Sequence, residues 1–198
     1  MKMIAIDPAS QTGWAVRGDG EGGTFAGETH GSADVRPAKP KAATKRNPTG
    51  LPGEPDGIRW LKLWQLLERL AQCDRCEGLV FPPDGLCGGC ADGRSKGIRL
   101  VHEGPLEHHA GARAARLAFG AWAVICAWCG VRGVPRVEVG PLDLQRFVLG
   151  RRATPKSYEV LQAAKDRLGY QGNDDNEADA MWLLRFAEAQ AAEWGGKS

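Results

Sequence analysis

Short apolar runs closed by polar residues alternate along the chain with longer stretches of helical periodicity. Residues 3–7, MIAID, form an apolar run that ends in an aspartate, which is typical of a buried strand. Tight Gly-rich turns separate the first three predicted strands, so they are expected to form an antiparallel meander. The predicted strands span residues 3–7, 12–17, 23–27, 97–104 and 136–139.

Helices are predicted where apolar residues recur every three or four positions. In residues 58–72 the side chains of Trp60, Leu63, Trp64 and Leu67 fall on one helix face. Further helices are predicted at residues 110–129, 142–149 and 156–168, and from about residue 175 onward. A meander followed by strands that are added through helical crossovers predicts an α/β fold with a mixed sheet, antiparallel first and parallel afterwards.

Length and composition fit a single domain over residues 1–198, with 42% hydrophobic and 25% charged residues. Residues 30–57 are rich in Pro, Gly, Lys and Ala and lack apolar periodicity, so a flexible basic loop is expected there. The longest apolar run, around residues 121–127, is far shorter than the ~20 residues of a membrane span. Asp7 follows the first residues without a long apolar stretch, so no signal peptide and a cytoplasmic location are expected, in a host cell if a phage encodes the chain.

Charge is unevenly distributed although the formal net charge is only +2. The stretch 36–46 carries Arg and Lys without any acid, and the tail from Asp174 onward is acidic. A second basic stretch contains Arg146, Arg151, Arg152 and Lys156. This separation is typical of a protein that binds an anionic ligand, such as nucleic acid, beside carboxylates that hold cations.

Four cysteines have the spacing C-x₂-C-x₁₀-C-x₂-C, namely Cys73, Cys76, Cys87 and Cys90. Two such pairs can provide the four thiolates of a tetrahedral Zn²⁺ site, which predicts a zinc insert at residues 73–90. Four protein ligands leave no position for water, so this zinc would be structural. Two disulfides or unliganded thiols are the alternatives. Cys126 and Cys129 lie in an apolar helix, where core packing is favoured over a redox or metal role.

Four acids stand at the ends of predicted elements: Asp7, Glu103, Asp175 and Asp179. Asp175 and Asp179 are four residues apart on a helix and therefore share a face. Converging carboxylates repel one another unless cations neutralise them, and hard oxygen ligands suit Mg²⁺ or Mn²⁺. Two such ions ~4 Å apart can promote phosphodiester hydrolysis. Taken singly, each acid also has an ordinary explanation, as a turn residue, a helix cap or a solvated side chain.

Several segments in this order resemble RuvC-type Holliday junction resolvases, of the RNase H-like superfamily, and most of all those of phages. The segments are MKMIAIDPASQTGWAV, VHEGP, the stretch from GVPRVEVGPLDLQRF to KDRLGY, and DDNEADAMWLL. The resemblance implies an RNase H-like mixed sheet flanked by helices. It also implies a metal-dependent endodeoxyribonuclease that resolves four-way or branched DNA by paired nicks and acts as a homodimer.

Residue by residue, the resemblance assigns Asp7, Glu103 and Asp179 as ligands of two Mg²⁺ or Mn²⁺ ions. Asp175 is favoured as the fourth ligand, with Asp174 and Asn176 as alternatives. Basic residues of the second basic stretch match the family's positions near the DNA: Arg146 stands where the family usually has a lysine, and Lys156 at a second basic position. The Cys₄ insert is not a standard part of this family.

Two other functions remain open from the sequence. One is a catalytically inactive nucleic-acid-binding protein on the same fold. Asn176 leaves this possibility open, because the resembled family often has a metal ligand at that position. The other is a superfamily nuclease for RNA–DNA hybrids, or one akin to transposon-associated RNA-guided enzymes. The helix at residues 110–129 is either a dimer face or a crossover helix. His102, His108 and His109 are expected at the surface or as caps, with a supporting catalytic role as the alternative. The tryptophans at helical spacings are expected in the core, with base stacking as the alternative.

Overall fold

The computed structural model of the chain describes residues 2–8, 11–17, 28–36, 58–71, 98–105, 111–150 and 157–194. The strands are β1 (Lys2–Asp7), β2 (Gln11–Arg17), β3 (Glu28–Asp34), β4 (Ile98–Glu103) and β5 (Arg136–Val139). The helices are α1 (Ile58–Leu70), α2 (Ala112–Arg132), α3 (Pro141–Leu149), α4 (Ser157–Leu168) and α5 (Asp175–Trp194).

The strands form one five-stranded sheet in the order β3-β2-β1-β4-β5. β2 pairs antiparallel with both β1 and β3, whereas β4 runs parallel to β1, and β5 runs parallel to β4. A 21-residue helix, α2, connects the parallel strands β4 and β5. The predicted mixed sheet, with an antiparallel meander and parallel strands added through helices, is confirmed.

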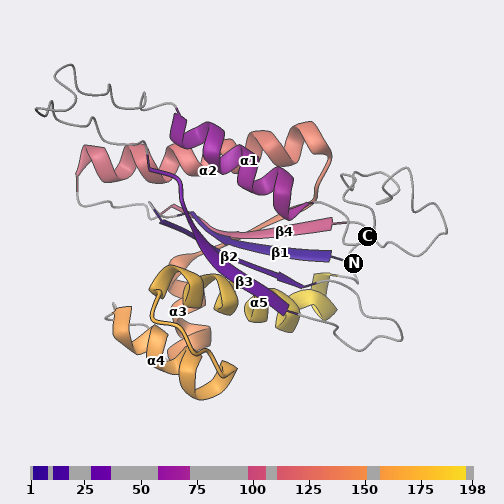
Figure 1. The fold of residues 1–198 in the computed structure, drawn as a ribbon. Coiled ribbons are helices and arrows are strands. Elements are labelled where there is room, and N and C mark those ends of the chain that lie inside the picture. The colour runs from indigo at the N-terminus through magenta and orange to yellow at the C-terminus, as the bar shows by residue number, and fades with distance from the viewer. Residues whose placement is uncertain are drawn as a thin grey trace, which may run out of the picture.

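Helices cover both faces of the sheet, with α1 and α2 on one face and α3, α4 and α5 on the other (Figure 1). Side chains of each strand alternate between the faces. In β1, Ile4 and Ile6 join the core beneath α1 and α2, whereas Met3 and Ala5 join the core beneath α5. The sheet therefore separates two hydrophobic layers. At the end of each strand, two successive side chains point to opposite layers.

The third strand is displaced from its predicted position. Strand β3 spans Glu28–Asp34, so the prediction of a loop is wrong for residues 30–34, while residues 23–27 lie outside the described residues. β3 is an edge strand whose segment ETHGSAD carries few apolar residues. Polar contacts with α5 fix it instead: Glu28 pairs with Arg185, and His30 contacts Glu177. Hydrophobic periodicity could not reveal a strand that is held in this way.

Helix α2 is apolar along most of its length, although only part of it is buried. The stretch Ala114–Arg132 is long and apolar enough to cross a membrane by length and composition, which corrects the expectation that no segment reaches that length. A core helix of a soluble protein passes the same test, and Ile125 and Trp128 of α2 are fully buried against the sheet side of the fold. However, only 22% of that stretch is buried. One face of α2 is therefore left apolar and uncovered by the described residues.

Candidate active site

Two of the predicted acids end neighbouring parallel strands. Ile6 of β1 stands opposite His102 of β4, so Asp7 and Glu103, one residue further along each strand, reach the same edge of the sheet. Side chains alternate along a strand, and each acid lies two residues after a residue that packs under α5, namely Ala5 and Val101. Both acids therefore project toward the α5 layer. Asp7 is only 7% exposed, which is unusual for a carboxylate.

The first two turns of α5 bring two further acids to this edge. Asp175 and Asp179 lie one turn apart on the helix, and the negative charge of each raises the pKa of Asp7. Asp179 is half-buried and Asp175 is exposed. We refer to Asp7, Glu103, Asp175 and Asp179 as the acidic edge.

A glycine of β2 sets how closely α5 approaches the sheet. Gly13 pairs with Asp7 across the first hairpin. A Cβ atom at Gly13 would lie 1.8 Å from the main-chain oxygen of Asn176. Only glycine allows the first turn of α5 to pack this closely, which holds Asp179 toward Asp7. We did not predict this role, although glycine inside an apolar strand is the sequence signal for close backbone approach.

Asp174 is the N-cap of α5. Its Oδ1 accepts hydrogen bonds from the main-chain N–H of Asn176 at 3.0 Å and of Glu177 at 3.4 Å. Its other carboxylate oxygen accepts a hydrogen bond from Gln11 of β2. Burial opposes ionisation, but hydrogen bonds that include those of Ser32 and Asn176 lower the pKa of Asp174 overall. This carboxylate is therefore engaged in holding the helix terminus.

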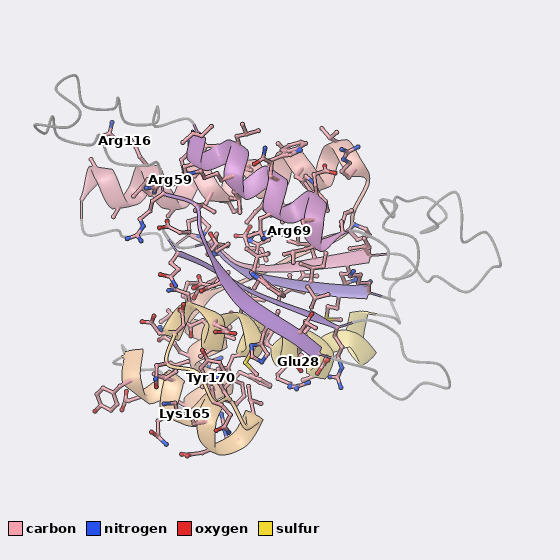
Figure 2. The ribbon with its side chains drawn as sticks, viewed as in Figure 1. Glu28, Arg59, Arg69, Arg116, Lys165 and Tyr170 are labelled. Atoms are coloured by element: carbon pink, nitrogen blue, oxygen red, sulfur yellow. The ribbon has the colours of Figure 1, made fainter. Side chains whose placement is uncertain are left out.

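Polar contacts along α5 fix the rest of the helix to the sheet. Tyr170, just before the helix, donates a hydrogen bond of 2.7 Å to Glu177, and Glu177 also contacts His30 of β3. Further along, Arg185 pairs with Glu28, which lies on β3 at the far end of the strand (Figure 2). The helix that carries Asp175 and Asp179 is thus anchored at its first turn and at its middle.

Burial and mutual repulsion make the acidic edge hard to ionise. Burial, then the negative charges of Glu103, Asp179 and Asp175, hold the pKa of Asp7 well above its ordinary value. Burial and the charge of Asp179 raise the pKa of Glu103 to about 7. Burial and the charge of Asp175 raise the pKa of Asp179 to about 7. Carboxylates in this situation are stabilised by binding protons or cations.

The donor set fits a hard divalent cation, since the acidic edge offers only carboxylate oxygens together with an excess of negative charge. The fit is one of chemistry and charge. Among the described residues, no three acidic, histidine or cysteine side chains already stand where they would enclose a metal ion.

The predicted DNA-contacting residues are placed only in part. Arg146 lies in the last turn of α3, is half exposed, and has its guanidinium 3.7 Å from the carboxylate of Asp143 on the same helix. Arg151, Arg152 and Lys156 lie outside the described residues. A role for these four side chains at DNA stays a prediction.

The predicted zinc ligands Cys73, Cys76, Cys87 and Cys90 all lie outside the described residues. The other two cysteines are free thiols in α2, and Cys129 is buried. Burial raises the pKa of Cys129 to about 12 and also raises the pKa of Cys126. Neither forms a reactive thiolate near neutral pH, in agreement with a packing role.

His102 is fully buried, so the expectation of a surface position is wrong. Its ring lies on the α2 face of the sheet, opposite to the side chain of Glu103. Nδ1 lies 3.0 Å from the main-chain oxygen of Glu103 and therefore carries the proton, and Nε2 lies 3.4 Å from the guanidinium of Arg136. His102 thus supports the end of β4 through its backbone. His108 and His109 lie outside the described residues.

The sheet order, the two helical layers and the acids at one sheet edge define an RNase H-like fold. Solved structures that match it include RuvC of Thermus thermophilus, with a TM-score of 0.54 and 15% sequence identity over 98% of this chain and 96% of that chain. A second match, T. thermophilus RuvC in complex with a Holliday junction substrate, has a TM-score of 0.54 and 14% identity over the same shares of the two chains. No protein-family model matches the sequence, and no curated protein does so. The similarity shows a RuvC-like fold.

Proposed function

We propose that this protein is a metal-dependent endonuclease that cuts four-way or branched DNA. The observation that carries the proposal is the acidic edge: the buried Asp7 of β1 and the half-buried Glu103 of β4 and Asp179 of α5 have raised pKa values at one edge of a RuvC-like sheet. Repulsion between these carboxylates destabilises the fold unless cations or protons neutralise them. Carboxylates with pKa values perturbed in this way are concentrated at functional sites.

In the proposed reaction, Asp7, Glu103, Asp175 and Asp179 hold Mg²⁺ or Mn²⁺ through their carboxylate oxygens. A divalent cation held there supplies an activated water and neutralises the charge that develops on the phosphodiester. Gly13 and Asp174 keep the first turn of α5 at the sheet, so that the acids of α5 face those of β1 and β4. Water is partly excluded at Asp7, which strengthens its interaction with a bound cation.

The substrate assignment rests on charge and on similarity of fold. One of the two matching structures is of RuvC bound to a Holliday junction substrate. In this chain, Arg146, Arg151, Arg152 and Lys156 follow β5 and precede α4, and we propose that they bind DNA phosphates.

A homodimer is the assembly that we propose for paired cutting of a two-fold symmetric junction. The exposed residues Phe119, Ala123, Ala127 and Val131 recur at four-residue intervals and form one apolar face of α2. Phe119 is 46% exposed and Val131 is 70% exposed. A second copy of the chain is the occupant that we propose for this face. Light scattering is expected to give the mass of a dimer, which Val131→Glu converts to a monomer; a monomeric wild type would contradict this assembly.

For the cysteine segment we propose a structural Zn²⁺ bound by Cys73, Cys76, Cys87 and Cys90. Metal analysis of the purified chain is expected to give about one zinc per protomer, which Cys73→Ser removes. Zinc-free wild-type protein that is fully folded would contradict it.

A panel of substrates tests the function itself. The wild-type chain with Mg²⁺ or Mn²⁺ is incubated with a four-way junction, a linear duplex of the same sequence and an RNA–DNA hybrid. We expect paired nicks in the junction and little cleavage of the duplex. Binding without cleavage would indicate an inactive DNA-binding protein, and preference for the hybrid would indicate a different nuclease.

A further inference from the structure

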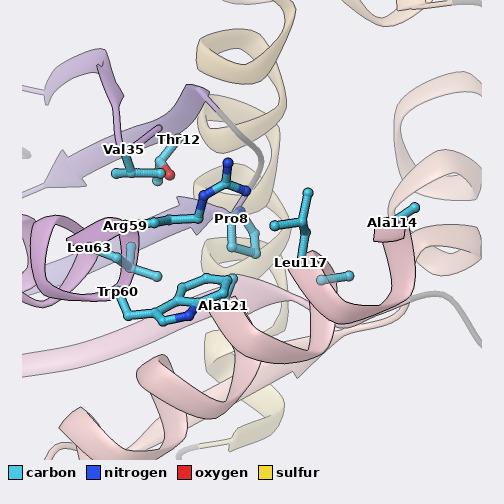
Figure 3. A pocket seen from close by; sticks show the side chains of 10 residues that line it. Pro8, Thr12, Val35, Arg59, Trp60, Leu63, Ala114, Leu117 and Ala121 are labelled. Atoms are coloured by element: carbon cyan, nitrogen blue, oxygen red, sulfur yellow. The ribbon is translucent and has the colours of Figure 1, made fainter. Parts of the chain in front are cut away.

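A pocket of about 270 Å³ lies between α1, α2 and the ends of the first two strands. Figure 3 shows the indole of Trp60 along one side, next to Ala121, and the side chain of Arg59 reaching across toward Pro8. Thr12 lines the strand side and Ala118 lines the α2 side. The volume falls just below the roughly 300–1,000 Å³ of pockets for drug-sized ligands, so it suits one small ring system.

The pocket lies beside the acidic edge, on the other face of the sheet. Pro8 directly follows Asp7, and Thr12 directly precedes Gly13, which pairs with Asp7. Because strand side chains alternate, Asp7 faces α5 while Thr12 faces the pocket beneath α1. Asp7 and the pocket therefore meet at the same strand ends, one on each face of the sheet.

The lining of the pocket has the chemistry that recognises an unstacked base. Trp60 is half-buried and rests on Gly120, where a Cβ atom would lie 2.4 Å from the indole, so the ring is held against α2. The guanidinium of Arg59 lies 5.9 Å from the centre of that ring. Within the part of the chain that the structure describes, no carboxylate forms an ion pair with Arg59. An indole face stacks on any base, and a guanidinium donates hydrogen bonds to the acceptors of a base edge or to a phosphate.

From this geometry we infer that the pocket formed by Pro8, Thr12, Arg59, Trp60 and Ala118 receives one unstacked nucleobase next to the phosphodiester that is cut. The inference rests on the proposed function, since it requires branched DNA at the acidic edge. Bases at the exchange point of a junction are less costly to unstack than those inside a duplex, because unstacking costs least where pairing is already interrupted. The pocket would therefore favour cleavage at branch points.

A binding cycle between protein and DNA variants tests the inference. Affinity for a four-way junction is measured in EDTA, so that no strand is cut, with the wild-type chain and with Trp60→Leu. Each measurement is repeated on junctions that carry a single abasic site, moved one position at a time along the strands near the exchange point. Trp60→Leu is expected to weaken binding to the intact junction about 5- to 150-fold, which corresponds to ~1–3 kcal/mol of base stacking.

On the junction that lacks the received base, the same substitution is expected to have almost no effect, because the base that Trp60 stacks on is absent. Ala118→Phe fills the pocket without removing Trp60 and is expected to reproduce this pattern. Gln65→Phe, at an exposed position of α1 away from the pocket, is the matched control and is expected to bind as the wild type does.

A loss of affinity that is equal at every abasic position would indicate a structural effect of Trp60 and would overturn the inference. Wild-type affinity in both Trp60→Leu and Ala118→Phe would overturn it as well. If the wild-type chain binds a junction no better than a duplex, the proposed function fails together with the pocket. If junction binding is selective but indifferent to the two pocket variants, the pocket alone is refuted.

Discussion

Replacing Asp179 by asparagine should stabilise the metal-free protein at pH 8. The substitution removes one charge from the acidic edge, where burial and the charge of Asp175 raise the pKa of Asp179 from 3.8 to about 7. A shift of this size corresponds to about 4 kcal/mol at most, at 1.36 kcal/mol per pKa unit. Because the carboxylates of Asp7 and Glu103 repel one another and Asp179, the three groups titrate together and one substitution relieves only part of the repulsion. We therefore expect Asp179→Asn to raise the free energy of unfolding by about 1–3 kcal/mol, and the unfolding temperature by roughly 2–10 °C.

The pH dependence gives this prediction an internal control. A carboxyl whose pKa is raised by folding contributes stability that is fully present below its unfolded pKa and is lost as the pH rises through its folded pKa. Wild-type protein in EDTA should therefore lose stability between about pH 4 and pH 7, as Glu103 and Asp179 ionise. At pH 4 Asp179 is already neutral, so the advantage of Asp179→Asn should vanish.

The assay is thermal unfolding in EDTA at pH 4 and pH 8, followed by a titration of Mg²⁺ at pH 8. The control is Asp166→Asn on α4, an exposed acid whose replacement should change stability by less than about 0.5 kcal/mol. Mg²⁺ should stabilise the wild type more than Asp179→Asn, since the variant lacks one ligand. A variant that is destabilised at pH 8, or equally affected at pH 4 and pH 8, would refute the reasoning.

Three further results follow from the described contacts. Gly13→Ala places a Cβ atom 1.8 Å from the backbone of Asn176, so unfolding by urea should show a loss of about 1–3 kcal/mol or more; wild-type stability would mean that α5 does not approach β2 this closely. Asp174→Ala removes the N-cap of α5 and should cost about 0.5–2 kcal/mol by the same assay, whereas Asp174→Asn keeps a capping side chain and should cost less; equal losses would argue against capping. The raised pKa of Cys129 predicts that a thiol reagent at pH 8 modifies it only on unfolding, as mass spectrometry would detect, and rapid labelling of the native protein would contradict its burial.

The sheet could be predicted where hydrophobicity alone determines the elements. β1 and β4 bury apolar runs, β5 alternates apolar and charged residues, and α1 shows its buried face as a regular spacing of leucines, so these elements lie close to their predicted positions. β3 could not be predicted in this way. Its residues contact α5 through charged and polar groups, and a pattern of hydrophobic residues carries no information about such contacts.

Within the candidate site, the sequence indicated the acids but not what holds them in place. Strand ends and an i, i+4 spacing point to Asp7, Glu103, Asp175 and Asp179. Asp175 was favoured over Asp174 and Asn176 by its i, i+4 spacing to Asp179, because one residue along a helix turns the side chain by about 100°. Only the hydrogen bonds of Asp174 to the first turn of α5 distinguish the cap from its neighbours. The pocket beside Asp7 joins β2, the residues that follow β1 and β3, and two helices, and its existence depends on packing that no local pattern encodes.

The cleavage rate of a four-way junction by wild type and by Asp7→Asn, at equal protein and Mg²⁺ concentrations, tests the central claim most directly. Asp7 is the most buried member of the acidic edge, and asparagine preserves its shape while removing its charge. If the acidic edge performs the reaction, Asp7→Asn remains folded, binds the junction and cuts it more than ~100-fold more slowly. Cleavage by folded Asp7→Asn at the wild-type rate would contradict the account.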